Sequence, residues 1–192
     1  MKKFNVKRRQ GGFTLVELMI VIVLIGIVAA IIISNMVGNT DAARAQLLKR
    51  VAKSSTESIS QVARTCGTSS AIAGSPLPAA GRSLLDIVFL GDPAVSATYK
   101  NCYADSSVRA LRDSVTKNGS AWQVGAFPMT ITGGGLSKFT VEFQRVPEAT
   151  VLALAQSYTE GLTTLAASDT TSDVVRYSAA TGGTRTVSVL LD

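Results

Sequence analysis

Apolar residues dominate the chain from Phe13 to Ile33. In the next stretch, residues 34–66, small or apolar residues recur at every third or fourth position. The first run is 21 residues long, and its one charged residue is Glu17. About 20 apolar helical residues suffice to span the hydrocarbon core of a bilayer. We therefore expect residues 13–33 to form an apolar transmembrane helix, in which the carboxylate of Glu17 is a candidate functional group.

A second helical pattern follows directly. The small or apolar residues of the stretch 34–66 recur at spacings of three and four, which is typical of one face of an α-helix. They are Leu48, Val51, Ser55, Ile59, Val62 and Cys66. We expect one helix from Phe13 to about Thr65, roughly 80 Å long at 1.5 Å per residue. Gly67 is its expected C-cap. The amphipathic half should pack on a domain, and the apolar half should protrude from it.

Strand patterns dominate the C-terminal part, which predicts an α+β fold with an antiparallel sheet. Residues 138–146 alternate apolar and polar, as in a half-buried antiparallel strand. Two shorter β-prone runs, 122–127 and 129–132, are separated by Pro128, and three glycines at 133–135 predict a turn. A helix is expected near 148–162, followed by a terminal hairpin around Gly182.

The segment 67–120 is expected to connect the long helix to this sheet. Its first part, 67–81, is rich in Gly, Ser, Ala and Pro, which indicates a loop. Residues 83–90 form a short apolar segment of undetermined type. A short helix is expected over 108–115, with Asp105 or Ser106 as its N-cap.

The boundary before the apolar run is the most specific feature of the sequence. Five positive charges lie in residues 1–12, which end in two glycines, and Phe-Thr-Leu-Val-Glu follows from Phe13 to Glu17. This segment resembles the processing site of type IV prepilins: a short basic leader ending in Gly, then Phe-Thr-Leu-x-Glu and an apolar helix. The motif match covers about the first 40 residues. Beyond them, the resemblance is only in the order of the elements, a long N-terminal helix followed by an antiparallel sheet.

That resemblance implies a set of roles. A prepilin peptidase would cut after Gly12 on the cytoplasmic side and remove the leader, residues 1–12. Phe13 would become the N-terminus and be N-methylated, and Glu17 would take part in subunit assembly. The protein would lie in the inner membrane with its C-terminus outward, which agrees with the basic leader remaining cytoplasmic. The assembly machinery would then polymerise it into an extracellular pilus.

Other targeting signals explain the N-terminus less well. The apolar run is too long for a secretory signal peptide, and no Ala-x-Ala cleavage site closely follows it. An uncleaved signal anchor accounts for the charge and the apolarity but for neither the glycines nor Glu17. Arg8-Arg9 as a twin-arginine signal is a weak competitor, because short basic leaders contain this pair by chance.

Two departures from the pilin pattern leave the IVa or IVb subtype open. The position that often holds proline, about 22 residues into the mature chain, is Ser34 here. A helix break at Gly26 or around 34–38 stays open, but proline does not enforce it. Many pilins also close a C-terminal loop with a disulfide, but here the second cysteine lies 90 residues before the end of the chain.

The two cysteines, Cys66 and Cys102, both lie on the side expected to be exported. An even pair in an oxidising compartment predicts one disulfide, here closing a loop of about 36 residues. The alternative is two buried free thiols.

The basic composition comes mainly from the leader. Of the 19 Lys and Arg residues, 14 remain once the five of the leader are removed, against 13 Asp and Glu. Such a balance does not indicate nucleic-acid binding. Within residues 34–66, five basic residues oppose two acidic ones, which suits an acidic neighbour or anionic headgroups, or simply a solvated face.

No constellation of catalytic residues is recognisable. The chain has no histidine, and its two separated cysteines do not make a zinc site. The acidic stretch 169–173 has the wrong spacing for an EF-hand and is better interpreted as a polar loop than as a calcium site. We expect neither an enzyme nor a cofactor or metal.

The leading interpretation is therefore a structural subunit of a type IV pilus that self-assembles through residues 13–33, with a stem at 34–66 and a sheet region at 121–192. The first alternative is a pseudopilin of a type II secretion system. The second is a minor pilin with an adhesive or DNA-binding tip module.

Overall fold

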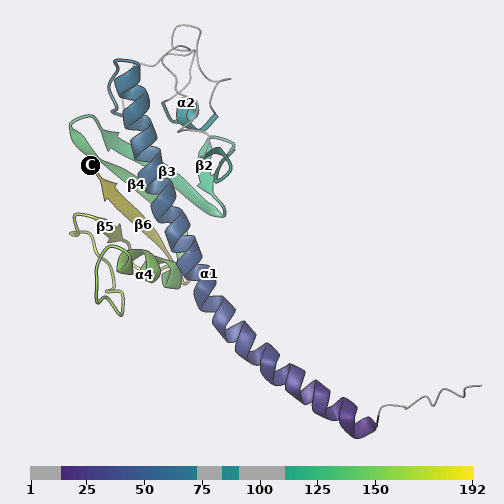
Figure 1. Ribbon diagram of the computed structural model, residues 1–192. Helices are drawn as coiled ribbons and strands as arrows, with labels where there is room; N and C mark the ends of the chain where they lie inside the picture. The colour runs from purple at the N-terminus through teal and green to yellow at the C-terminus, as the bar shows by residue number, and fades with distance from the viewer. Residues whose placement is uncertain (1–13, 73–83, 91–110) are drawn as a thin grey trace, which may run out of the picture. The chain divides into compact units, whose positions relative to one another are not determined.

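The computed structural model describes residues 14–72, 84–90 and 111–192, the side chains of 33–39 excepted (Figure 1). The chain divides into two compact units, Met1–Thr40 and Asp41–Asp192. The long N-terminal helix α1 (Leu15–Thr65) is followed by a six-stranded antiparallel sheet with two short helices. The predicted α+β class, with a long N-terminal helix followed by an antiparallel sheet, is confirmed.

Helix α1 has 51 residues and is helical throughout, including Gly26 and residues 34–38. It ends as predicted, because Gly67 takes a positive φ of 64°. The Gly67 N–H donates to the carbonyl of Arg64, and the Thr68 N–H donates to that of Ala63. These two bonds form a Schellman motif, in which glycine supplies the left-handed residue that stops the helix.

The second half of α1 packs on the sheet through the predicted stripe. Leu48, Val51, Ser55, Ile59 and Val62 are buried, and Cys66 is half-buried. The apolar members of this stripe share one hydrophobic core with the inward residues of the strands. The spacing of three and four thus identified the packed face correctly. Ser55 fits there because its hydroxyl donates to the Val51 carbonyl at 2.5 Å, so no buried hydrogen bond is lost.

The strands of the sheet lie in the order β1-β2-β3-β4-β6-β5. The longest, β4 (Ser137–Pro147), buries Phe139, Val141 and Phe143 as predicted and is hydrogen-bonded to β3 (Phe127–Gly134) and β6 (Thr184–Leu191). At one edge, β5 (Val175–Tyr177) pairs with β6 and completes the predicted terminal hairpin. At the other edge, β1 (Val115–Asn118) pairs with β2 (Ala121–Val124).

Two predicted boundaries at this second edge were wrong. Val115, expected in a helix, opens β1; of the expected helix 108–115, only 111–112 are both described and helical. Pro128 does not break the strand, and the break falls at Gly125, whose φ is 58°. Pro128 is tolerated because it pairs only with β2, and the register with β4 begins one residue later.

Among the described residues, two short helices accompany the sheet in the unit Asp41–Asp192, here called the sheet domain. The apolar segment near 83–90 is α2 (Leu84–Leu90), whose Asp86 receives a 2.5 Å bond from Lys117 on β1. The helix expected near 148–162 is α4 (Glu148–Gln156), which is shorter than predicted. Leu162 matched the helical spacing but lies beyond the helix, and the chain leaves α4 through a loop that extends to β5.

The glycine turn between β3 and β4 receives the segment that follows α1. The Ile72 N–H donates to the Gly133 carbonyl at 2.9 Å, and the Gly135 N–H donates to Ser70 Oγ at 3.0 Å. Gly134 has a φ of 86°, and a Cβ there would overlap the Ser70 carbonyl oxygen and lie 2.6 Å from the Phe139 ring. The turn therefore needs glycine for both conformation and space.

We expect Gly134→Ala to lower the free energy of unfolding by about 2–4 kcal/mol, combining left-handed strain with overpacking. Gly125→Ala is the matched control, because its φ is 58° but no atom lies within 4 Å of the added Cβ. That variant should lose only about 1 kcal/mol. Denaturant unfolding of both full-length variants in detergent measures the difference. Equal losses would show that crowding at Gly134 has no effect.

Candidate functional site

The start of α1 is fixed by a reciprocal pair of side chains, Thr14 and Glu17. Glu17 Oε2 accepts hydrogen bonds from the Thr14 backbone N–H at 2.8 Å and from Thr14 Oγ1 at 2.9 Å. In return, the Glu17 N–H donates to Thr14 Oγ1 at 3.3 Å. This is a capping box, with Thr14 as N-cap and Glu17 at the third helical position.

Sequence reasoning missed this motif, although its signal is visible as Thr-x-x-Glu before an apolar run. It adds a local role to Glu17, which was considered from the sequence only as the one charge of the apolar run. Every bond of the carboxylate among the described residues is made by Oε2. Oε1 therefore remains available to a donor from outside the chain.

The rest of the apolar segment buries nothing within its own unit. All side chains from Thr14 to Ile32 are exposed, and Leu15–Ile32 is long and apolar enough to cross a membrane. Glu17 is the one charge in that stretch. An apolar surface of this size must be covered by lipid or by other apolar helices. Gly12 and Phe13, the predicted processing site, lie outside the described residues and remain predictions.

Cys66 lies directly after α1, and its N–H donates to the Val62 carbonyl at 2.9 Å. The side chain is half-buried. Cys102 lies outside the described residues, so the pairing of the two cysteines remains a prediction. A bridge from Cys66 would anchor the connecting segment to the end of α1.

We expect non-reducing peptide mapping to find Cys66 linked to Cys102. The chain-entropy account gives a stabilisation of about 3–4 kcal/mol for a loop of this length. Cys66→Ser should therefore lower the unfolding midpoint of the sheet domain while leaving processing and membrane insertion unchanged. Labelling of both cysteines by a thiol reagent, in protein exported under native conditions, would contradict the bridge.

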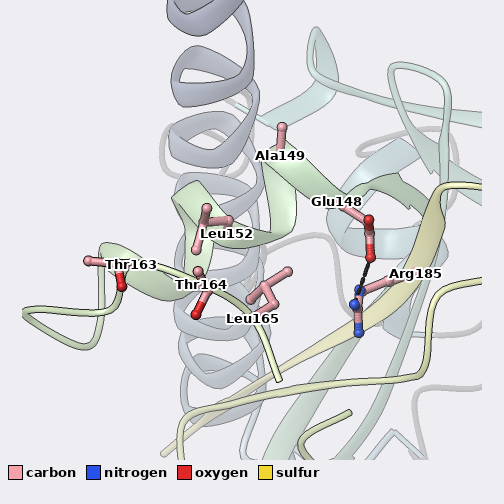
Figure 2. A pocket seen from close by; sticks show the side chains of 7 residues that line it. All are labelled: Glu148, Ala149, Leu152, Thr163, Thr164, Leu165 and Arg185. Carbon is pink, nitrogen blue, oxygen red and sulfur yellow. Dashed lines mark hydrogen bonds and ion pairs between the residues drawn. The ribbon is translucent and has the colours of Figure 1, made fainter. Parts of the chain in front are cut away.

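The irregular chain between α4 and β5 is held by Arg185 on β6, whose side chain is only 8% exposed. Its Nε donates to Glu148 Oε1 at 2.8 Å (Figure 2). Its Nη1 donates to the carbonyls of Ala166, Ala167 and Ser178. The guanidinium also lies over the Tyr177 ring. Arg185 thus lies between β6 and the loop, and its charge is compensated by the Glu148 carboxylate, three carbonyls and the Tyr177 ring.

A cavity of about 360 Å³ opens beside this pair. Its lining combines the Glu148–Arg185 ion pair with two leucines and two threonines, which come from α4 and the following loop (Figure 2). The polar lining groups at its base are already bonded to each other. The cavity therefore offers no unpaired charge for a ligand.

The acidic stretch at 169–173 is a structured turn. Asp169 Oδ1 accepts the backbone N–H groups of Thr171 at 3.0 Å and Ser172 at 3.1 Å. These bonds hold the pKa of the Asp169 carboxyl below its usual range. At the other end of the loop, burial raises the pKa of the Tyr158 hydroxyl. The described residues contain no group of three or more acidic or cysteine side chains that could hold a metal ion.

Comparison with known proteins finds similarity at the N-terminus. The family described as the prokaryotic N-terminal methylation motif matches residues 7–33. The type II secretion system core protein G of Aeromonas hydrophila is 52% identical over 40 residues, 21% of this chain and 28% of that protein. Those of Dickeya chrysanthemi and Klebsiella pneumoniae are 48% and 46% identical over 40 and 39 residues, 21% and 20% of this chain and 26% and 28% of theirs.

The matched segment thus spans little more than a quarter of these relatives. It confirms that the N-terminal segment is type IV pilin-like, as the sequence predicted, and that it carries the methylation motif. The same 40 residues make up a smaller share of this chain than of the Aeromonas protein, so this chain is longer. No solved structure matches it significantly.

Proposed function

We propose that this chain is a structural subunit that polymerises through its apolar helix into a type IV pilus. The observation that carries the proposal is the composition of residues 14–32: all exposed, apolar along their length and bearing one carboxylate. A single pass through a membrane needs no such charge. In a helix that must leave the membrane and join a polymer in one register, such a charge can select that register.

Processing is the first step of the proposal. A prepilin peptidase removes residues 1–12 on the cytoplasmic side, and Phe13 becomes an N-methylated N-terminus. The matched methylation motif, which extends from residue 7 to residue 33, supports this step. The basic leader keeps the N-terminus cytoplasmic until then, so the sheet domain lies outside the inner membrane.

Charge pairing is the second step. The capping box holds Glu17 through Oε2 and leaves Oε1 without a bond from the described residues. In the processed chain, the new amine belongs to Phe13, four residues before Glu17 in the sequence. When a neighbouring subunit's Phe13 amine binds Oε1, both charges are neutralised in an apolar environment. A misregistered subunit leaves both charges unpaired, which is costly, so the pair selects the register.

A pseudopilin of a type II secretion system is the second candidate, because the similar proteins are core components of that system. Their similarity lies within the segment that pilins and pseudopilins share. The greater length of this chain and its loop between α4 and β5 favour a pilus over a compact pseudopilin. A minor pilin at a filament tip would share the same N-terminus, and the near-neutral mature charge gives no support to DNA capture as its main role.

Deletion of the gene distinguishes these candidates. We expect surface filaments containing this chain to disappear and to return on complementation. Abundant filaments that persist without the chain would assign it a minor role. A defect in protein secretion, with no filaments in the parent strain, would establish the pseudopilin instead.

A further inference from the structure

The outward face of α1 within the sheet domain carries a row of polar residues, here called the basic stripe. Its members are all exposed, recur at spacings of three and four and lie opposite the buried stripe: Gln46, Arg50, Lys53, Glu57, Gln61 and Arg64. Lys53 is 3.9 Å from Glu57. The side chains of Arg50 and Arg64 form no ion pair or hydrogen bond with any residue that the structure describes. A shallow cleft of about 310 Å³ lies at the end of the stripe.

The loop between α4 and β5, residues 157–174, has the opposite charge. It holds Glu160, Asp169 and Asp173 and neither lysine nor arginine. Asp169 is occupied by its own turn. Glu160 and Asp173 are exposed, and neither has a partner in the described ranges 14–72, 84–90 and 111–192. We call this segment the acidic loop.

The backbone of each surface is held by contacts within the sheet domain. The acidic loop is held by Arg185, by a bridge between Asp169 and Tyr177, and by the bond from Gln156 Nε2 to the Leu162 carbonyl at 2.8 Å. The stripe is part of a helix packed on the core. Because the backbones that carry these charges are already ordered, pairing costs only the conformational entropy of the side chains, and each surface is preorganised to that extent.

We infer that the basic stripe of one subunit docks on the acidic loop of a second copy of this chain. The inference rests on the proposed polymerisation and names the surfaces through which the sheet domains meet. The basic stripe and the acidic loop are different surfaces, so the contact is head-to-tail. Each subunit binds one neighbour through its basic stripe and another through its acidic loop. Such contacts propagate into helical filaments. Two unpaired cations on the stripe match two unpaired anions on the loop.

A charge swap in full-length protein tests the docking. We expect Arg50→Glu with Arg64→Glu, and separately Glu160→Lys with Asp173→Lys, each to reduce the yield of sheared filaments roughly fivefold or more, because pairs become repulsions. Combining all four should restore the yield to within about twofold of the parent chain. Lys138→Glu is the control, since this residue is exposed and its side chain forms one ion pair among the described residues, with Asp192, and the filament yield of this variant should not change.

The amount of processed protein and its thermal unfolding midpoint in detergent establish that each variant is folded. Parental yields from both reversed doubles, or no recovery in the combined variant, would overturn the docking. Failure of the proposed function looks different, because the parent chain itself would then form no filaments.

Zero-length carbodiimide cross-linking provides a measurement on the unaltered chain. In filaments grown from a mixture of ¹⁴N and ¹⁵N subunits, we expect mixed-isotope cross-links between Lys53 and either Glu160 or Asp173. The intrachain Lys53–Glu57 link serves as the internal control. Detecting that control link without any intermolecular link from Lys53 to the loop would contradict the docking.

Discussion

Glu17→Ala is expected to abolish filaments while leaving membrane insertion intact. The substitution makes the apolar helix more apolar, so insertion should be as good as in the parent chain or better. The partner of the neighbouring Phe13 amine is lost, and assembly must then bury an unpaired ammonium group. Processed protein should accumulate in the membrane without filaments, as measured by fractionation and electron microscopy of sheared material. The methylation of Phe13 should be checked by mass.

Glu17→Gln separates the two roles that the structure gives this residue. Glutamine can still accept the Thr14 N–H in a capping box but carries no charge. If the charge is what assembly requires, Glu17→Gln should also be impaired, whereas Thr14→Ser, which keeps the cap, should assemble. Glu17→Asp should restore assembly only in part, because its shorter side chain changes the reach. Normal filament numbers from Glu17→Ala would show that the charge has no role in assembly.

Arg185→Leu is expected to lower the free energy of unfolding of the sheet domain by about 2–4 kcal/mol. The substitution leaves two loop carbonyls and the carbonyl of Ser178 without their donor, and Glu148 without its cation. Unfolding of the detergent-solubilised chain measures the loss. Hydrogen exchange should show the loss of protection concentrated in residues 166–178.

Arg176→Leu on the neighbouring strand is the matched control. Arg176 is half-buried, and its side chain donates one hydrogen bond among the described residues, from Nε to the Ser172 carbonyl at 2.7 Å. Its replacement should cost about 1 kcal/mol. If the two variants lose the same stability, Arg185 does not hold the loop in the way described.

The parts of the fold that follow a simple period were predictable from the sequence. The buried stripe of α1 recurs at three and four, and the inward residues of β4 alternate, because each element packs one face on a single core. The end of α1 was predictable for a different reason, since Gly67 supplies a conformation that other residues adopt at a cost.

Boundaries fixed by tertiary contacts were not predictable in this way. Val115 begins a strand because it pairs with Val124, and no local signal specifies that partner. Tyr158 has helical spacing but lies beyond α4, where its ring contacts Lys49 of α1. Pro128 fits within β3 because β3 pairs with β4 only from Met129 onward, so no hydrogen bond to β4 is lost at the proline.

Two functional side chains were missed although the sequence carries a signal for each. The reciprocal cap has the sequence signature Thr-x-x-Glu, at Thr14 and Glu17. The prediction treated the Glu17 carboxylate only as a charge and did not pair it with Thr14. Arg185 shares the inward phase of Val187 and Val189 along β6. A lone arginine in that phase indicates a buried cation that needs several acceptors, and the loop from 157 to 174 supplies two of them, the carbonyls of Ala166 and Ala167.

The central claim is that a processed form of this chain polymerises. Intact-mass measurement and N-terminal sequencing of the subunit from sheared surface filaments test it most directly. The account predicts a chain that begins at Phe13, carries one added methyl group and lacks residues 1–12. A subunit that still carries Lys2, or surface filaments in which this chain is absent, would contradict it.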